Sequence, residues 1–253
     1  MKKVCWIIGA SSGIGEALAN KFYKKNYDLV ISARSIDKLE LIKENLKHPQ
    51  NQDSGKILVI ELDVSVYDSL QKSLKEIISE FQKIDLVIFC SALYQPMSVI
   101  DFDLETSKKI IDVNLVGMLN LLHLIVPQMI KQKSGHIAAI ASVAGYCGLP
   151  KSFAYGASKA ALINLCEGIY PELKLNNIDL SIINPGFVKT RLTDQNNFKM
   201  PFLISSKEAA DLIFQGLMRK KFEIHFPKKF TFFLKILQLL PYRIFFFITK
   251  KLI

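Results

Sequence analysis

The chain has 253 residues, enough for one large domain that buries about 70 to 75% of the surface its unfolded chain would expose. Hydrophobic residues make up 50% and charged residues 22%, a balance that is typical of globular proteins and excludes a largely disordered chain. The net charge is +10, but six basic residues and no acidic residue lie from Ile224 onward. A nucleic-acid-binding protein is therefore not expected, because its basic residues would also lie on the folded body.

Short apolar runs alternate with amphipathic segments along the chain. The runs that predict strands are, in order, VCWII, LVISA, ILVIEL, LVIFCSA, HIAAIAS, LSIIN and FEIHF. Helices are predicted over about 15–25, the segment IDKLELIKENL, and about 67–82, 105–131, 152–175 and 206–219. Nearly continuous apolar strands separated by helices indicate a doubly wound α/β domain, with a parallel sheet covered on both faces and ligands outside the carboxyl ends of the strands. We expect residues 1–227 to form this Rossmann-type domain and residues 228–253 to form an apolar, basic tail.

A glycine-rich segment, GASSGIG, lies between the first strand and the first helix. Gly9 would allow a tight turn, Gly13 a close approach of the backbone to a ligand, and Gly15 close packing of the helix. The start of the helix would offer free N–H groups to a phosphate. This segment therefore predicts a dinucleotide site.

The end of the second strand bears on the choice of cofactor. An NAD site has an acidic residue here, about 20 residues beyond the glycines, that binds the ribose hydroxyls. This chain has Ala33 in that place, followed by Arg34. An arginine can bind a 2′-phosphate through two hydrogen bonds, so the sequence favours NADP(H) over NAD.

Two Tyr and Lys pairs have the same helical spacing, Tyr155 with Lys159 and Tyr170 with Lys174. Residues four apart on a helix lie on the same face, so spacing alone does not separate the pairs. Only the first pair follows a serine, Ser142, at the end of an apolar strand where a ligand would bind. We therefore expect the first pair to be the catalytic one.

The order of these motifs resembles the short-chain dehydrogenase/reductase family over residues 3–227. The motifs are GASSGIG, LDV with Asp63, VNLVG with Asn114, Ser142, YGASK, and NPGFVKT ending at Thr190. The resemblance implies a catalytic tetrad of Asn114, Ser142, Tyr155 and Lys159. The cofactor-binding residues that it implies, together with Arg34, are Gly9, Ser11, Ser12, Gly13, Ile14, Gly15, Asp63, Val64, Ala92, Tyr155, Lys159, Pro185, Gly186, Val188 and Thr190.

The sequence departs from the family pattern at two places. The segment FCSA, Phe89 to Ala92, stands where the family has Asn-Asn-Ala-Gly, and Ile8 stands where it has a threonine before the first glycine. Both changes remove polar groups that brace the cofactor site, and neither touches the tetrad.

The tetrad has a direct chemical rationale. A tyrosine with a pKa near 10 needs a nearby cation to stabilise its phenolate, and Lys159 is one turn away. Tyr155 would donate a proton to a carbonyl oxygen that the Ser142 hydroxyl holds, while the nicotinamide supplies a hydride. Lys159 would also hold the nicotinamide ribose, and Asn114 would anchor a water that relays protons.

Other residues narrow the setting. The four cysteines form no CxxC pair and indicate free thiols in a reducing compartment, so a cytoplasmic location is expected. The four histidines are scattered, and no metal site is expected. The polar and then apolar segment 191–205 predicts a substrate lid that supplies Phe198, Met200 and Phe202.

The tail is the one segment that the resemblance does not explain. A helix over 230–240 would place Thr231, Lys235 and Gln238 on one stripe among apolar residues. Lys235, Pro241 and Arg243 interrupt any stretch of about 20 apolar residues, which disfavours a membrane span. A helix at the surface of a cytoplasmic membrane face is favoured, and a cover over the pocket or a contact with another subunit is the alternative.

The sequence thus predicts an NADPH-dependent carbonyl reductase, or the reverse alcohol dehydrogenase, with an apolar or lipid-like substrate. The family often pairs subunits, so a homo-oligomer, a dimer or a tetramer, is expected. A protein that binds NADPH without catalysis, as a sensor or scaffold, is the alternative, and the complete tetrad disfavours it. An NAD-dependent enzyme with the same chemistry is a second alternative.

Overall fold

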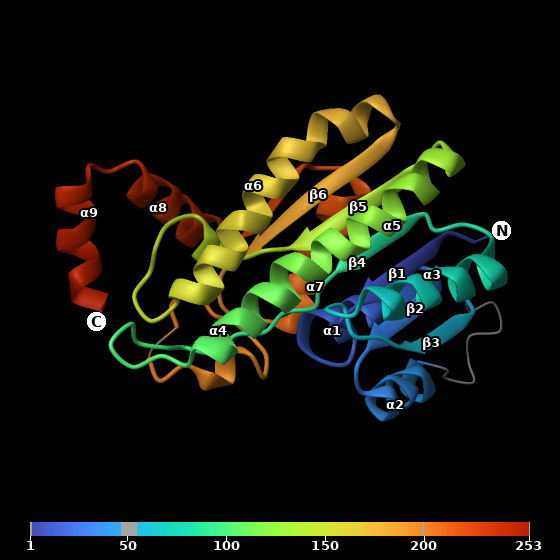
Figure 1. Cartoon of the computed structure of the whole chain (residues 1–253), viewed down its shortest axis with the longest axis horizontal. Coiled ribbons are helices and arrows are strands. Elements are labelled where there is room, and N and C mark those ends of the chain that lie inside the picture. The colour runs from blue at the N-terminus through green and yellow to red at the C-terminus, as the bar shows by residue number, and fades with distance from the viewer. Residues whose placement is uncertain (1, 47–54, 199, 253) are drawn as a thin grey trace.

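The computed structural model describes residues 2–46, 55–198 and 200–252 (Figure 1). Seven parallel strands form one sheet in the order β3-β2-β1-β4-β5-β6-β9. The order runs outward in both directions from β1, which is the arrangement of a doubly wound sheet. Their bounds are β1 Val4–Ile8, β2 Asp28–Ala33, β3 Ile57–Glu61, β4 Leu86–Phe89, β5 Gly135–Ile140, β6 Ile178–Pro185 and β9 Glu223–Phe226. The predicted fold class is therefore confirmed.

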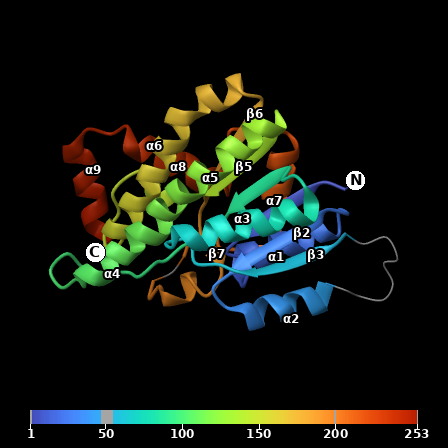
Figure 2. The same ribbon diagram turned by 45° about the vertical axis from the view of Figure 1, so that its right-hand side comes forward.

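Helices cover both faces of the sheet, as Figures 1 and 2 show from two directions. Helices α3, α5 and α6 pack on one face and α1, α2 and α7 on the other, each layer with its own hydrophobic cluster. Strands such as β1 and β4 are buried along their whole length, which explains why they are continuously apolar. The helix bounds are α1 Gly13–Tyr23, α2 Ile36–Leu46, α3 Tyr67–Phe81, α4 Leu104–Ile111, α5 Gly117–Gln132, α6 Phe153–Leu175 and α7 Ser206–Met218.

The predicted long helix over 105–131 is present but is not uniform. One π-helical turn, Asp112–Val116, lies between α4 and α5. Such turns are often found at functional sites, and this one contains Asn114. Within the described residues, Leu104–Gln132 is the one helical stretch whose length and composition would allow it to cross a membrane. Its α5 part packs on the sheet through buried residues such as Leu121 and Ile125, as a core helix does.

Several predicted boundaries differ from the structure. Helix α1 begins at Gly13 instead of residue 15, directly after the turn that follows β1. Strand β5 ends at Ile140, so Ser142 does not end a strand but caps the 3₁₀ turn Val143–Gly145, accepting a hydrogen bond from the Ala144 N–H at 3.1 Å.

The tail forms two short helices, α8 (Lys228–Gln238) and α9 (Tyr242–Thr249), followed by a 3₁₀ turn, Lys250–Leu252. Helix α8 begins two residues before the predicted start at 230, and Pro241 separates the two helices. Helices α8 and α9 both lie at the end of the molecule toward which β5 and β6 run (Figure 1). The tail is thus next to the carboxyl ends of the strands, where the sequence predicts the site.

Candidate active site

A cavity of about 360 Å³ opens at the carboxyl ends of the central strands. Loops after β1, β2, β3, β4, β5 and β6 all reach it, because parallel strands end at one edge of the sheet. The lining residues that the sequence predicted are Gly9, Ser11, Ser12, Gly13, Ile14, Arg34, Asp63, Val64, Ala92, Ser142, Tyr155, Lys159, Pro185, Gly186, Val188 and Thr190. Gly15 and Asn114 are the two predicted site residues that do not line it.

The turn after β1 requires glycine for two different reasons. Gly9 and Gly13 have φ of 90° and 61°, in the left-handed region that glycine favours. A Cβ on Gly9 would also lie 2.6 Å from the Ser91 nitrogen, and a Cβ on Gly15 would clash with the carbonyl of Gly9. Gly15 is therefore a packing residue behind the cavity, which explains why it does not line it.

Backbone and thiol contacts hold the turn after β1, next to the two departures from the family pattern. The carbonyl of Ser32 accepts hydrogen bonds from the N–H groups of Gly9 and Ala10, at 2.7 and 3.1 Å. The Cys90 thiol accepts from the Gly15 N–H, and burial raises the pKa of this thiol to about 12. The Cys90 side chain thus braces the turn as a neutral group.

Arg34 lies at the end of the cavity that β2 and β3 form, together with Asp63. Burial alone would raise the pKa of Asp63, but hydrogen bonds from Ser65 and the charge of Arg34 lower it. Lys38, in the first turn of α2, lines the same end and was not predicted. A helix that begins just after Arg34 could have indicated it, because its first turn faces back toward the strand end.

Ser142, Tyr155 and Lys159 meet at the opposite end of the cavity. The hydroxyls of Ser142 and Tyr155 share a hydrogen bond. The Nζ of Lys159 is 5.5 Å from the centre of the Tyr155 ring and donates to the carbonyl of Ile140 at 2.8 Å. Two hydroxyls and one cation therefore face a single region where a carbonyl could bind.

Burial dominates the ionisation of this group. It raises the pKa of Tyr155 to about 12, although the hydrogen bond with Ser142 acts against that shift. It lowers the pKa of Lys159 to about 8. The expected depression of the tyrosine pKa by Lys159 is therefore not present in the protein alone, and Tyr155 carries its proton at neutral pH.

Asn114 lies behind the cavity wall, fully buried in the π-helical turn. Its side chain exchanges two hydrogen bonds with the backbone of Leu93, at 2.7 and 3.0 Å, and donates to Ser158 at 2.9 Å. This fixes the loop after β4 against α6. Its predicted part in a proton relay remains a prediction.

The segment 191–205 follows the short strand β7 (Val188–Lys189) and ends in β8 (Ile204–Ser205), which pairs with β7. Phe198, Met200 and Phe202 do not line the cavity; the two phenylalanine rings contact Phe187 and Phe230. The segment reaches Tyr155 indirectly, since Asn196 accepts a hydrogen bond from Tyr94 at 2.7 Å and the Tyr94 ring packs 4.9 Å from that of Tyr155.

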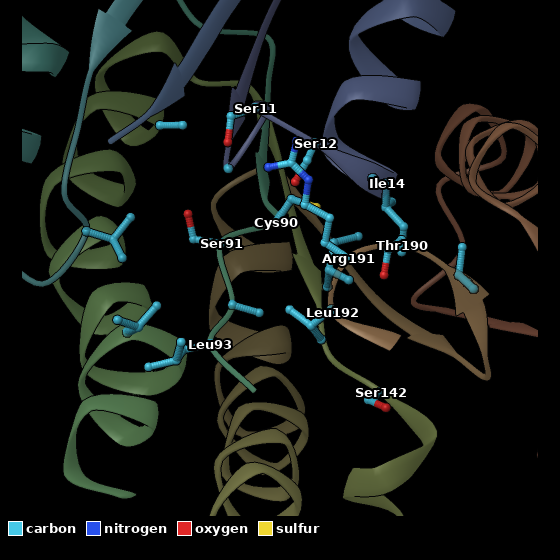
Figure 3. Close-up of a pocket in the computed structure, with 18 of the residues that line it drawn as sticks. Ser11, Ser12, Ile14, Cys90, Ser91, Leu93, Ser142, Thr190, Arg191 and Leu192 are labelled. Atoms are coloured by element: carbon cyan, nitrogen blue, oxygen red, sulfur yellow. The ribbon is translucent and has the colours of Figure 1, made fainter. Parts of the chain in front are cut away.

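The start of this segment contributes residues that the sequence analysis missed. Figure 3 shows the side chain of Arg191 extending toward Ser12 in the glycine-rich turn. Leu192 lies below it, facing the region of Leu93 (Figure 3). The position of Arg191 directly after Thr190, the last residue of a predicted motif, is the signal that could have indicated it.

Two of the three residues of the polar stripe predicted for the tail, Thr231 and Lys235, face the protein, whereas the third, Gln238, is exposed. Thr231 is fully buried and Lys235 bonds to Glu223, while Phe232, Phe233, Ile236 and Leu239 are 45 to 82% exposed. Helix α9 likewise exposes apolar residues, including Phe246 and Phe247. The outer surface of the tail thus combines exposed apolar side chains with basic ones, Lys228, Lys229, Arg243, Lys250 and Lys251.

The histidines, cysteines and acidic residues form no metal-binding group in the described part of the chain. There, no three His, Cys, Asp or Glu side chains come together as metal ligands would, and His48 lies outside the described residues. All four cysteines are free, as predicted; Cys5 and Cys166 are buried and the other two half-buried.

Comparison with known proteins decides the family. Residues 3–200 match the family model of the short chain dehydrogenases. The chain belongs to the short-chain dehydrogenase/reductase family. An uncharacterized oxidoreductase of Myxococcus xanthus is 30% identical over 93% of this chain and 91% of its own length.

Solved structures of a short chain dehydrogenase/reductase and of an alcohol dehydrogenase share the fold. One from Burkholderia phymatum, in complex with NAD, has a TM-score of 0.80 at 23% identity and covers 88% of both chains. An alcohol dehydrogenase from Thermococcus sibiricus, complexed with 5-hydroxy-NADP, has a TM-score of 0.79 at 25% identity and covers 88% of this chain and 95% of its own. Membership of the family and these neighbours support an oxidoreductase with a nicotinamide cofactor.

Proposed function

We propose that the protein is an NADPH-dependent carbonyl reductase, which in the reverse direction acts as an alcohol dehydrogenase. The observation that carries the proposal is the meeting of Ser142, Tyr155 and Lys159 in the same cavity as the glycine-rich turn. A protein that only bound the cofactor would not need a buried tyrosine and a buried lysine at that place.

The cavity fits a dinucleotide. Its glycine-rich turn leaves no room for side chains at Gly9, and the N-terminus of α1 faces the cavity through Ser12, Gly13 and Ile14. These N–H groups would hold the pyrophosphate. Asp63 and Val64 would hold the adenine side, while Ala92, Pro185, Gly186, Val188 and Thr190 would line the nicotinamide side.

The bound NADPH would supply the hydride, and residues of this chain would supply the proton and stabilise the charges that form. Tyr155 is protonated at neutral pH and would donate to the carbonyl oxygen of the substrate. The Ser142 hydroxyl would hold the same oxygen and stabilise its developing negative charge. Lys159, held by Ile140, would stabilise the phenolate that Tyr155 becomes and would bind the nicotinamide ribose.

A preference for NADP(H) is supported by two cations at the adenosine end. Ala33 provides no carboxylate for ribose hydroxyls, whereas Arg34 and Lys38 line the cavity there. Both would bind a 2′-phosphate.

The substrate and the setting follow from the surfaces around the pocket. Tyr155 packs with Leu93, Met97, Ile110 and Ala154 in an apolar cluster, which supports an apolar or lipid-like carbonyl compound as the substrate.

The exposed apolar side chains of the tail and its basic residues support peripheral association with an anionic membrane on its cytoplasmic side. We also propose a homo-oligomer, since the α4 and α5 helices expose Leu104, Leu119 and Ile130.

The test is a screen of ketones and alcohols that follows nicotinamide absorbance with NADPH and with NADH. Turnover that is faster with NADPH supports the proposal. Tight NADPH binding with no turnover of any carbonyl or alcohol would favour a cofactor sensor instead.

A further inference from the structure

Glu223, the first residue of the edge strand β9, joins three separate elements of the molecule. One carboxylate oxygen, Oε1, accepts hydrogen bonds from the Tyr146 hydroxyl at 2.6 Å and the Asn184 amide at 3.0 Å. The other, Oε2, accepts from the Nζ of Lys235 in helix α8. We call these four residues the Glu223 cluster.

Two members of the Glu223 cluster, Tyr146 and Asn184, are adjacent in the chain to turns that line the cavity. Tyr146 follows the 3₁₀ turn that Ser142 caps, and its N–H bonds to the carbonyl of Val143 at 3.1 Å. Asn184 immediately precedes Pro185 and Gly186, which line the cavity. The carboxylate thus connects the serine turn with the turn on the nicotinamide side.

The third member brings the tail into the same arrangement. Besides its bond to Glu223, the Nζ of Lys235 lies 5.3 Å from the centre of the Tyr146 ring. Around this contact, Leu234 and Leu237 of α8 form a small hydrophobic cluster with Val143 and Tyr146. Helix α8 therefore packs on the serine turn through both polar and apolar contacts.

Helix α8 supports the second turn as well. The ring of Phe230 stacks on that of Phe187 at 5.6 Å and lies so close to Gly186 that a Cβ there would be 2.9 Å from it. The Ser142 turn and the Pro185–Gly186 turn thus both pack against helix α8.

The charge of Lys235 matters because Glu223 is half-buried. Burial alone would raise the pKa of Glu223, but the hydrogen bonds from Lys235, Tyr146 and Asn184 lower it, so the side chain stays ionised. A carboxylate accepts hydrogen bonds from two neutral donors more strongly than a protonated acid does. Lys235 supplies the only cation that the described residues place in a salt bridge with Glu223.

We propose that Glu223 and Lys235 are positioning residues of the active site, which hold the Ser142 turn and the Pro185–Gly186 turn in register. The tail is then a working part of the catalytic domain in addition to any contact with a membrane. This inference rests on the proposed reductase function, because its effect on rate is visible only if carbonyl compounds are substrates. Loss of the ion pair would let Ser142 shift, and shifts of about 1 Å can cost about 100-fold in rate.

The experiment compares full-length variants in solution, without membranes. Lys235→Met keeps the apolar stem of the side chain and removes its charge. We expect kcat for a small soluble ketone to fall about tenfold or more. The NADPH Kd should change less than kcat, since most residues that would hold the cofactor lie on other elements. Lys235→Arg keeps the cation and should restore most of kcat.

Lys229→Met is the matched control. It removes the same charge from the same helix, and Lys229 is exposed and forms no salt bridge within the described part of the chain. This variant should retain wild-type kcat. Equal kcat in Lys235→Met and Lys229→Met would overturn the inference.

Hydrogen exchange of the backbone amides of Ala144, Gly145 and Tyr146 provides a readout that needs no turnover. Exchange should be faster in Lys235→Met than in Lys229→Met. Absence of turnover in the wild type, with this difference in exchange present, would reject the reductase function and leave the support of the turn intact. If Lys235→Met does not fold, Tyr146→Phe, which removes only the hydroxyl bound to Glu223, decides by the same readouts.

Discussion

Lys159 is fixed against Tyr155 by the strand that precedes them: its Nζ bonds to the Ile140 carbonyl at 2.8 Å while lying 5.5 Å from the tyrosine ring. The second pair with the same spacing is arranged differently. Lys174 bonds to Asp179 at 2.7 Å, and the Tyr170 ring packs against Phe222 at 4.7 Å. Equal spacing on one helix thus gives one pair directed at a cavity and one pair in surface and packing contacts.

This difference predicts unequal effects of two identical substitutions. Tyr155→Phe removes the proton that would go to the carbonyl, so the rate should fall by about 10² to 10⁴ or more. NADPH binding, measured by fluorescence titration, should change little. Tyr170→Phe is the control and should keep nearly full activity in a steady-state assay. Similar activity of the two variants would contradict the catalytic assignment.

Arg34→Asp should shift the preference from NADPH toward NADH. It replaces a charge-assisted contact to the 2′-phosphate, which contributes about 1.5 to 3 kcal/mol, with a repulsion. The ratio of kcat/KM for the two cofactors is the quantity to measure. Arg219→Asp makes the same charge change at an exposed position that does not line the cavity and should leave this ratio unchanged. The assignment is wrong if both variants keep the wild-type ratio.

The pH dependence of carbonyl reduction should follow Lys159. The pKa of Lys159 is lowered to about 8 and that of Tyr155 raised to about 12. Between these values the proton donor is retained but the cation is lost, so kcat/KM should decline as pH rises through about 8. Lys159→Arg should be less active but should lack this decline, because a guanidinium stays protonated. A rate that stays constant up to pH 10 in the wild type would refute this reading.

Membrane association should depend on the exposed apolar face of the tail. We expect the full-length protein to sediment with anionic vesicles at low salt, since apolar insertion and about 1 kcal/mol for each basic residue near the surface act together. The double variant Phe232→Ser, Leu239→Ser should bind more weakly, because these side chains are 64 and 82% exposed.

A matched double variant tests whether position matters more than loss of apolar surface. Leu41→Ser, Leu175→Ser removes two side chains that are 57 and 85% exposed, outside the tail. It should sediment like the wild type. Wild-type protein that stays in the supernatant at low salt would show that the tail does not bind such membranes.

The fold and much of the cavity were predictable from local patterns. The alternation of apolar runs and amphipathic segments determined a parallel sheet covered on both faces, because such strands are buried throughout. Glycines at Gly9 and Gly13 indicated the cofactor turn, because the backbone there adopts a conformation that other residues rarely take. These features depend on residues near one another in the chain.

Contacts between distant segments could not be predicted in the same way. The sequence placed Lys235 on a polar stripe but did not tell which way this side chain faces. In the structure Lys235 contacts Glu223, which is 12 residues away in the chain, and Tyr146, which lies far earlier. Burial, too, is a property of the packed molecule, and it leaves Tyr155 protonated where its neighbour Lys159 suggested the opposite shift. The sequence by itself thus determined the fold, and it indicated the glycine turn and the residues proposed for catalysis, because these follow from periodicity, local conformation and residue type. Only the tertiary structure decided the ionisation of the site and the docking of the tail on it, because both depend on what surrounds each group in space.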